Sequence, residues 1–130
     1  MAALSDYAEK LLLDWSMTTG SAIRPTAWYV ALYTAAPSDS GGGTEVSGSG
    51  YSRKSVTFGA ASSPGGTTSN TNTVTFTASG GSWGTVSHIG IFDNSTGGNL
   101  LWHGAMTASK SVADGDTLEF SIGNIDLTIA

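Results

Sequence analysis

Short segments of alternating apolar and polar residues dominate the chain from residue 51 onward, and glycine-rich turns separate them. The alternation is clearest in residues 51–58, 71–77, 85–92 and 117–122. A period of two lets a strand bury one face and expose the other. Residues 28–33, 99–106 and 125–129 are also rich in strand-forming side chains. The pattern predicts about seven or eight short strands.

The segments between these strands have the composition of turns and loops. Residues 37–50 and 62–70 are polar and rich in glycine and serine, and Asp114-Gly115-Asp116 has the composition of a hairpin turn. Parallel strands need long crossover connections, usually helices, and such helices are not expected here. We therefore predict a mainly all-β fold over residues 26–130, an antiparallel β-sandwich or flattened barrel.

The first twenty residues predict one helix in front of this β region. Ser5 suits its N-cap and Gly20 its end. A short helix is unstable alone in water, so its apolar stripe needs a surface to pack on. That surface is either the core of its own chain or a neighbouring subunit, and we expect Met1 to be ordered with it. The stripe has the three-and-four spacing of a helix face and consists of Leu4, Tyr7, Ala8, Leu11, Leu12 and Trp15.

Composition limits the classes of partner. At 130 residues the chain is sized for a single domain, residues 1–130. Charged residues make up 12% of the chain, against roughly 25% in an average globular protein, and 18 glycines and many hydroxyl residues take their place. Such a surface has a low free-energy cost of desolvation, so it suits contacts with other proteins. The net charge of −5 argues against nucleic acid. We expect neither a membrane span nor a signal peptide.

The sequence offers little catalytic chemistry. His88 and His103 lie in different predicted strands, with no metal-spaced ligand beside either, and the chain contains no cysteine. The oxygen-rich segments around Asp93 and Asp114 match turns better than calcium loops. We therefore predict no catalytic, metal or cofactor site, and no enzyme activity.

The tryptophans are the other candidates for ligand binding, because indole rings can stack on sugars. Trp15 and Trp28 lie inside apolar patterns and are expected in the core. Trp83 lies in a turn between Gly81 and Gly84, so it is the candidate for an exposed contact. An exposed Trp83 would favour a carbohydrate-binding module.

Several segments resemble small virion structural proteins of tailed bacteriophages, commonly labelled tail fibre proteins. The resemblance extends over nearly the whole chain, from the N-terminal helix to the final strand. It implies a non-enzymatic part of a virus particle, made in the host cytoplasm. The segments that carry it are residues 4–15, 25–33, 50–53, 56–58, 83–93 and 99–102.

The place of such a protein on the particle is argued from its size. A whole receptor-binding fibre needs a shaft and repeats, and this chain shows no repeat. A capsid decoration (cement) protein on the major capsid protein is our main hypothesis, with a tail fibre or tail-tip component as the alternative. Low charge favours a symmetric homo-oligomer, and a trimer is the expected form. The expected assembly interface consists of Leu4, Tyr7, Leu11, Trp15, Arg53 and Lys54.

Overall fold

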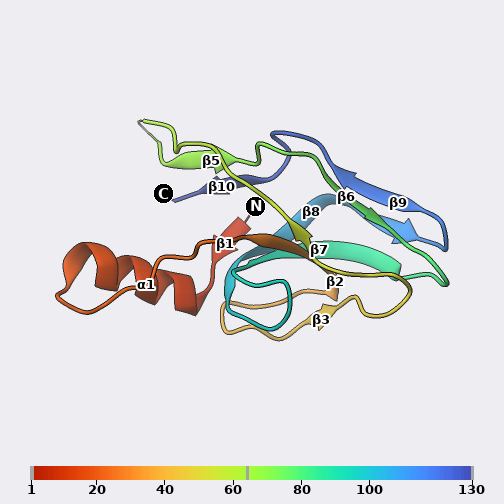
Figure 1. Ribbon diagram of the computed structural model, residues 1–130, viewed down its shortest axis with the longest axis horizontal. Coiled ribbons are helices and arrows are strands. Elements are labelled where there is room, and N and C mark those ends of the chain that lie inside the picture. The colour runs from red at the N-terminus through yellow and green to blue at the C-terminus, as the bar shows by residue number, and fades with distance from the viewer. Residues whose placement is uncertain (1, 64, 130) are drawn as a thin grey trace.

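The computed structural model describes residues 2–63 and 65–129, which are mainly β (Figure 1). Met1, expected to be ordered, lies outside the described residues. No helix in this part of the chain is long and apolar enough to cross a membrane. The elements in chain order are β1 (Ala2–Leu4), α1 (Asp6–Met17), β2 (Tyr29–Ala35), β3 (Thr44–Glu45), β4 (Lys54–Ser55), β5 (Thr67–Ser69), β6 (Val74–Thr77), β7 (Gly84–Phe92), β8 (Leu100–Val112), β9 (Thr117–Phe120) and β10 (Asp126–Thr128).

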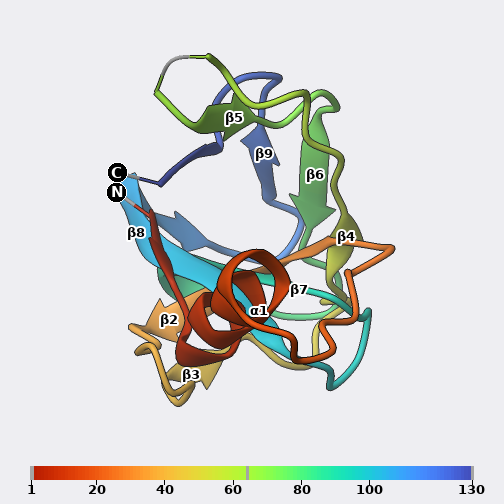
Figure 2. The same cartoon turned by 90° about the vertical axis from the view of Figure 1, so that its left-hand side faces the viewer.

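The strands form two layers, and their pairs are antiparallel. The larger sheet has the order β1-β8-β7-β2-β3, and β4 also pairs with β2. Two strand pairs, β6-β9 and β10-β5, form the opposite layer, which lies above the large sheet in Figure 2. Different strands end the large sheet, so it is open rather than closed into a flattened barrel. The predicted antiparallel sandwich with one N-terminal helix is confirmed.

The core lies between the two layers. Val30 and Leu32 of β2 and Phe76 of β6 are fully buried, and Leu118 of β9 is nearly so. In β6 and β9 every second residue is buried, as the alternating pattern predicts. Phe76 meets Phe120 edge-on, with ring centroids 6.4 Å apart. The alternation therefore identified the side chains with which β6 and β9 contribute to the core.

Residues 51–58, predicted as one strand, instead cross from one layer to the other. Only Lys54 and Ser55 form β4 against β2. Thr57 then accepts a backbone hydrogen bond from Thr71 at 2.8 Å, and Phe58 bridges to Asn70. The segment changes partners within three residues, so its alternation does not produce one long strand.

Three strands form where none was predicted. β3 and β5 lie in segments expected to be polar loops, and β1 takes the start of the expected helix. β5 pairs with β10, and the hydroxyls of Thr67 and Thr128 lie 3.0 Å apart across the pair. Such strands are stabilised by partners distant in the sequence, which explains why local hydrophobicity does not reveal them.

The turn at residues 114–116 forms, but it does not close a hairpin. Gly115 has a φ of +84°, which suits glycine, and Asp116 N donates to Ala113 O at 2.9 Å. β8 on one side pairs with β7, whereas β9 on the other pairs with β6. The turn therefore carries the chain from the large sheet to the opposite layer.

Candidate assembly surfaces

Helix α1 is anchored firmly at its first turn. The buried Ser5 side chain caps the helix by accepting from Ala8 N at 3.1 Å, as predicted, and its hydroxyl donates to Leu100 O. Asp6 N donates to Asp39 O at 2.9 Å. Leu4 lies outside the helix, in β1 opposite Trp102. The start of the helix is therefore fixed to β8 and to the loop that contains Asp39.

The rest of α1 projects beyond the end of the sandwich (Figure 1). Ala8 is its one buried residue among those described, Leu11 and Leu12 are half-buried, and Trp15 is 74% exposed. The apolar stripe continues along the helix, but the β layers end before it does. The expectation that Trp15 belongs to the core is wrong, and the stripe covers the chain's own core only at its first turn.

The exposed end of α1 forms an apolar hollow with the segment that returns toward β2. Its volume is about 440 Å³, and Ile23 beside it is 83% exposed. Contiguous exposed apolar side chains mark interaction sites in soluble proteins more often than isolated ones do. We call this surface the helix patch; it is lined by Leu11, Leu12, Trp15, Ala22, Arg24 and Pro25.

Arg53, expected at an interface between subunits, forms an ion pair within its own chain. Its Nε and Nη2 donate to Oε2 and Oε1 of Glu45, each at 2.9 Å. Its Nη1 donates to Asn94 O and Gly97 O, and the guanidinium lies 3.6 Å from the centroid of the Phe92 ring. These contacts connect the loop before β4, strand β3 and the loop between β7 and β8, so the role of Arg53 in this structure is internal.

The electrostatics around Arg53 favour the charged pair. Burial works to raise the pKa of Glu45, but hydrogen bonds from Arg53 and Tyr51 outweigh it and leave that pKa below its ordinary value. The hydrogen bond to Glu45 raises the pKa of Arg53. Burial raises the pKa of Tyr51, whose hydroxyl donates to Glu45 Oε2 at 2.7 Å. Lys54, the other expected interface charge, pairs through its backbone with Val30.

Trp83 is buried, contrary to the expectation of an exposed ring. It is 7% exposed, its indole N–H donates to Ser49 O at 3.1 Å, and it meets Tyr51 edge-on at 5.6 Å between centroids. The glycines around it let the turn fold back so that the ring enters the core. A carbohydrate site on an exposed Trp83 is therefore excluded.

The two histidines occupy neighbouring strands but do not converge on one site. His103 Nε2 lies 2.7 Å from Asp39 Oδ1, whereas His88 Nδ1 lies 2.8 Å from Ser87 Oγ. In residues 2–63 and 65–129, no group of three or more His, Cys, Asp or Glu side chains could hold a metal ion.

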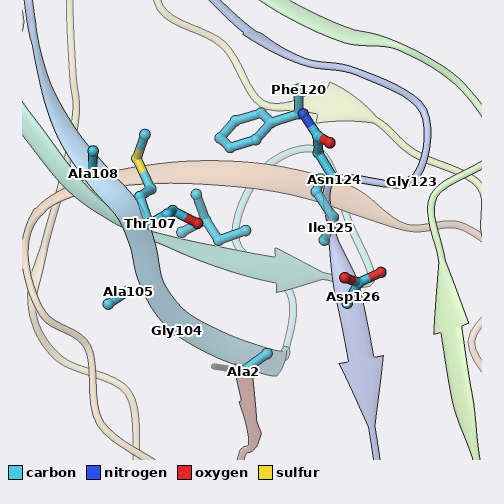
Figure 3. A pocket seen from close by; sticks show the side chains of 12 residues that line it. Ala2, Gly104, Ala105, Thr107, Ala108, Phe120, Gly123, Asn124, Ile125 and Asp126 are labelled. Carbon is cyan, nitrogen blue, oxygen red and sulfur yellow. The ribbon is translucent and has the colours of Figure 1, made fainter.

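A groove of about 560 Å³ opens along one side of the sandwich, and sequence reasoning did not identify it (Figure 3). Residues 104–108 of β8 form one wall, and residues 123–126, which lead from the turn after β9 into β10, form the other. Ile89 and Ile125 contribute apolar side chains, and the ring of Phe120 points into the space. The groove is formed by two segments distant in the sequence, so no local sequence pattern predicts it.

The sequence as a whole was compared with known proteins. No curated protein matches this chain. A family described as Podophage GP4 fiber I protein gp80 matches residues 3–128, from β1 through β10. That match covers the N-terminal helix and both layers of the sandwich. The chain therefore belongs to the podophage GP4 fiber I protein gp80 family, a family of structural phage fibre proteins.

Proposed function

We propose that this protein is a non-enzymatic component of a phage tail fibre or tail tip, attached to other virion proteins. The single observation behind this proposal is the family match over residues 3–128, because the family is described as a fibre protein. The match favours the fibre hypothesis over capsid decoration, which was our main expectation from the sequence. The sandwich supplies a stiff module for such an assembly.

The geometry supports a structural rather than a catalytic role. His88 and His103 have separate polar neighbours, so they do not form an acid–base pair. The strongest charge cluster, Arg53 with Glu45, is occupied in joining loops. A hydrolase would need titratable groups that converge on an accessible pocket.

The helix patch is the surface we assign to assembly. Trp15 is exposed, and Leu11 and Leu12 are half-buried beside it. Burying a large apolar side chain contributes roughly 1.5–3 kcal/mol, so covering this patch would stabilise a complex substantially. The patch could be shared within a homo-oligomer, with a trimer as the expected form, or contact a different tail protein.

Electron cryo-microscopy of intact particles tests the proposed location. We expect density for the sandwich and its projecting helix at the tail or its fibres. Copies arranged on the icosahedral lattice of the capsid would instead support the decoration hypothesis and overturn the fibre proposal. Particles carrying Trp15→Ala should show reduced occupancy at the tail, with Lys10→Ala on the same helix as the control.

A further inference from the structure

Two stretches of consecutive residues line the groove beside β8. Five consecutive residues, 104–108, form one wall, and four consecutive residues, 123–126, form the other. Side chains of a strand alternate between its two faces, so the wall formed by consecutive residues of β8 is the edge of that strand. A strand edge presents a row of N–H and C=O groups. The groove therefore has the chemistry that recognises another extended backbone.

β1 already occupies one end of the same crevice. Ala2 pairs with Gly104 and Leu4 with Trp102, antiparallel to β8, and Ser5 N continues the line by donating to Leu101 O at 2.9 Å. β1 also lies beside β10, and Ala2 lines the end of the groove (Figure 3). In residues 2–63 and 65–129, β1 is the one strand on this edge of β8. β1 thus shows how an added strand would lie.

The rest of the groove limits which segment could fit. Its apolar residues, Ile89, Phe120 and Ile125, favour aliphatic side chains turned inward. Asp126 lies at the rim of the groove, where its carboxylate accepts a hydrogen bond from the Ser69 hydroxyl. Its negative charge disfavours an acidic side chain in the bound segment. Beyond the far end, Lys110 Nζ donates to Thr117 O and ties β8 to β9.

An irregularity in β8 keeps this site short. Ala105 pairs with His88, and Lys110 pairs with Val86. Four residues of β8, 106–109, therefore lie opposite a single residue of β7, Ser87. A bulge of this kind bends the strand and prevents open-ended sheet growth. The edge therefore suits a segment of a few residues.

We propose that this groove binds a short extended segment of another virion protein, antiparallel to β8 and in line with β1. Backbone hydrogen bonds to the edge of β8 would hold the segment, and alternate aliphatic side chains would enter the groove. A residue without negative charge would lie next to Asp126. The assignment of the segment to a virion protein rests on the proposed function; the peptide-binding chemistry does not.

Nuclear magnetic resonance titration of the isolated protein tests the site with a defined probe, acetyl-Thr-Val-Lys-Val-Thr-Val-amide. We expect shifts at the amides of residues 105–110 and 123–126, with a dissociation constant of about 1 mM. The matched peptide with each Val replaced by Pro lacks the alternate N–H donors and should not bind. Replacing its Lys by Glu should weaken binding beside Asp126.

Two variants of β8 separate groove binding from contact elsewhere. Thr107→Trp places a large ring in the groove and should weaken binding by about tenfold or more. Ser111→Trp puts the same ring on the same strand outside the groove and should leave binding unchanged. Both positions are exposed, so folding should survive, which the amide spectrum checks.

Three outcomes would overturn the inference. They are no shifts at several millimolar peptide, equal binding by the Pro peptide, and equal binding by Thr107→Trp. A protein that oligomerises on its own and becomes monomeric with Thr107→Trp would assign the groove to a second copy instead. These outcomes are independent of where the protein lies on the particle, so the fibre proposal would stand or fall separately.

Discussion

Two tryptophans, Trp15 and Trp83, lie in regions that differ in local structure and in exposure to solvent. Trp15 sits in a regular apolar stripe on α1 and is 74% exposed, whereas Trp83 sits in a glycine-flanked turn and is 7% exposed. The local patterns predicted the reverse. A stripe buries a ring only where another layer lies opposite it, and the sandwich ends before Trp15. Position relative to the two layers, rather than local periodicity, decides which ring is buried.

The largest expected effect is loss of the buried ring. Trp83→Ala should lower the free energy of unfolding by about 3–5 kcal/mol, because it leaves a cavity beside Tyr51 and removes the indole hydrogen bond to Ser49 O. Urea denaturation monitored by circular dichroism measures this. A loss below about 1 kcal/mol would show that Trp83 is not part of the core.

Next in size is the ion pair between Arg53 and Glu45. Arg53→Ala should cost about 1.5–3 kcal/mol, since it removes charge-assisted hydrogen bonds to Glu45 and two loop carbonyls. Arg53→Lys should recover only part of this, because Lys cannot form the bidentate contact. Equal stability of Arg53→Lys and the unaltered protein would argue against the bidentate geometry.

The same ion pair predicts a dependence on pH. The pKa of Glu45 is lower in the folded state than in the unfolded chain, so the pair stabilises the protein fully above the unfolded value, about 4.3. This contribution to stability is lost as the pH falls through the lower pKa that Glu45 has in the folded state. In Glu45→Gln the decline in melting temperature between about pH 5 and pH 3 should be shallower. An unchanged slope would contradict the assignment.

For the exposed ring, the comparison predicts a small change in stability and a large change in assembly. Trp15→Ala should alter the free energy of unfolding of the isolated protein by no more than about 0.5 kcal/mol. Incorporation into particles should fall clearly. A large stability loss in the isolated chain would mean that the ring packs on its own domain.

The smallest effect is expected for the Lys10–Asp14 pair on the exposed side of α1. Lys10→Ala should cost about 0.3–0.5 kcal/mol, and added salt should remove the difference. Thermal unfolding at low and high ionic strength measures it. A larger, salt-insensitive loss would indicate a second role for Lys10.

Much of the secondary structure follows from local sequence. The period of two located β6, β7 and β9 to within a few residues, and strand-forming side chains located β2 and β10. Ser5 was correctly identified as the helix cap. β3 and β5 were not predicted, because two or three polar residues form a strand only when a distant partner supplies the hydrogen bonds. β1 escaped because Leu4 fits a helical stripe equally well.

The candidate sites were less predictable than the strands. The chain has few charged residues, so Arg53 was expected to pair with a neighbouring subunit. Its partner is instead Glu45, eight residues away in its own chain. The groove has no local sequence motif, because its walls come from β8 and from residues 123–126, which lead into β10. Sites built from backbone edges leave little trace in side-chain patterns.

By itself, the sequence determined the class of fold, the turns and the alternating residues of the core, because these depend on neighbours along the chain. Only the tertiary structure decided that the turn at residues 114–116 changes layers, that Trp83 is buried and Trp15 exposed, and that β8 keeps an accessible edge beyond β1. The physical reason is the same in each case. Strand pairing and burial depend on segments far apart in the sequence, and no local period records which segments will meet.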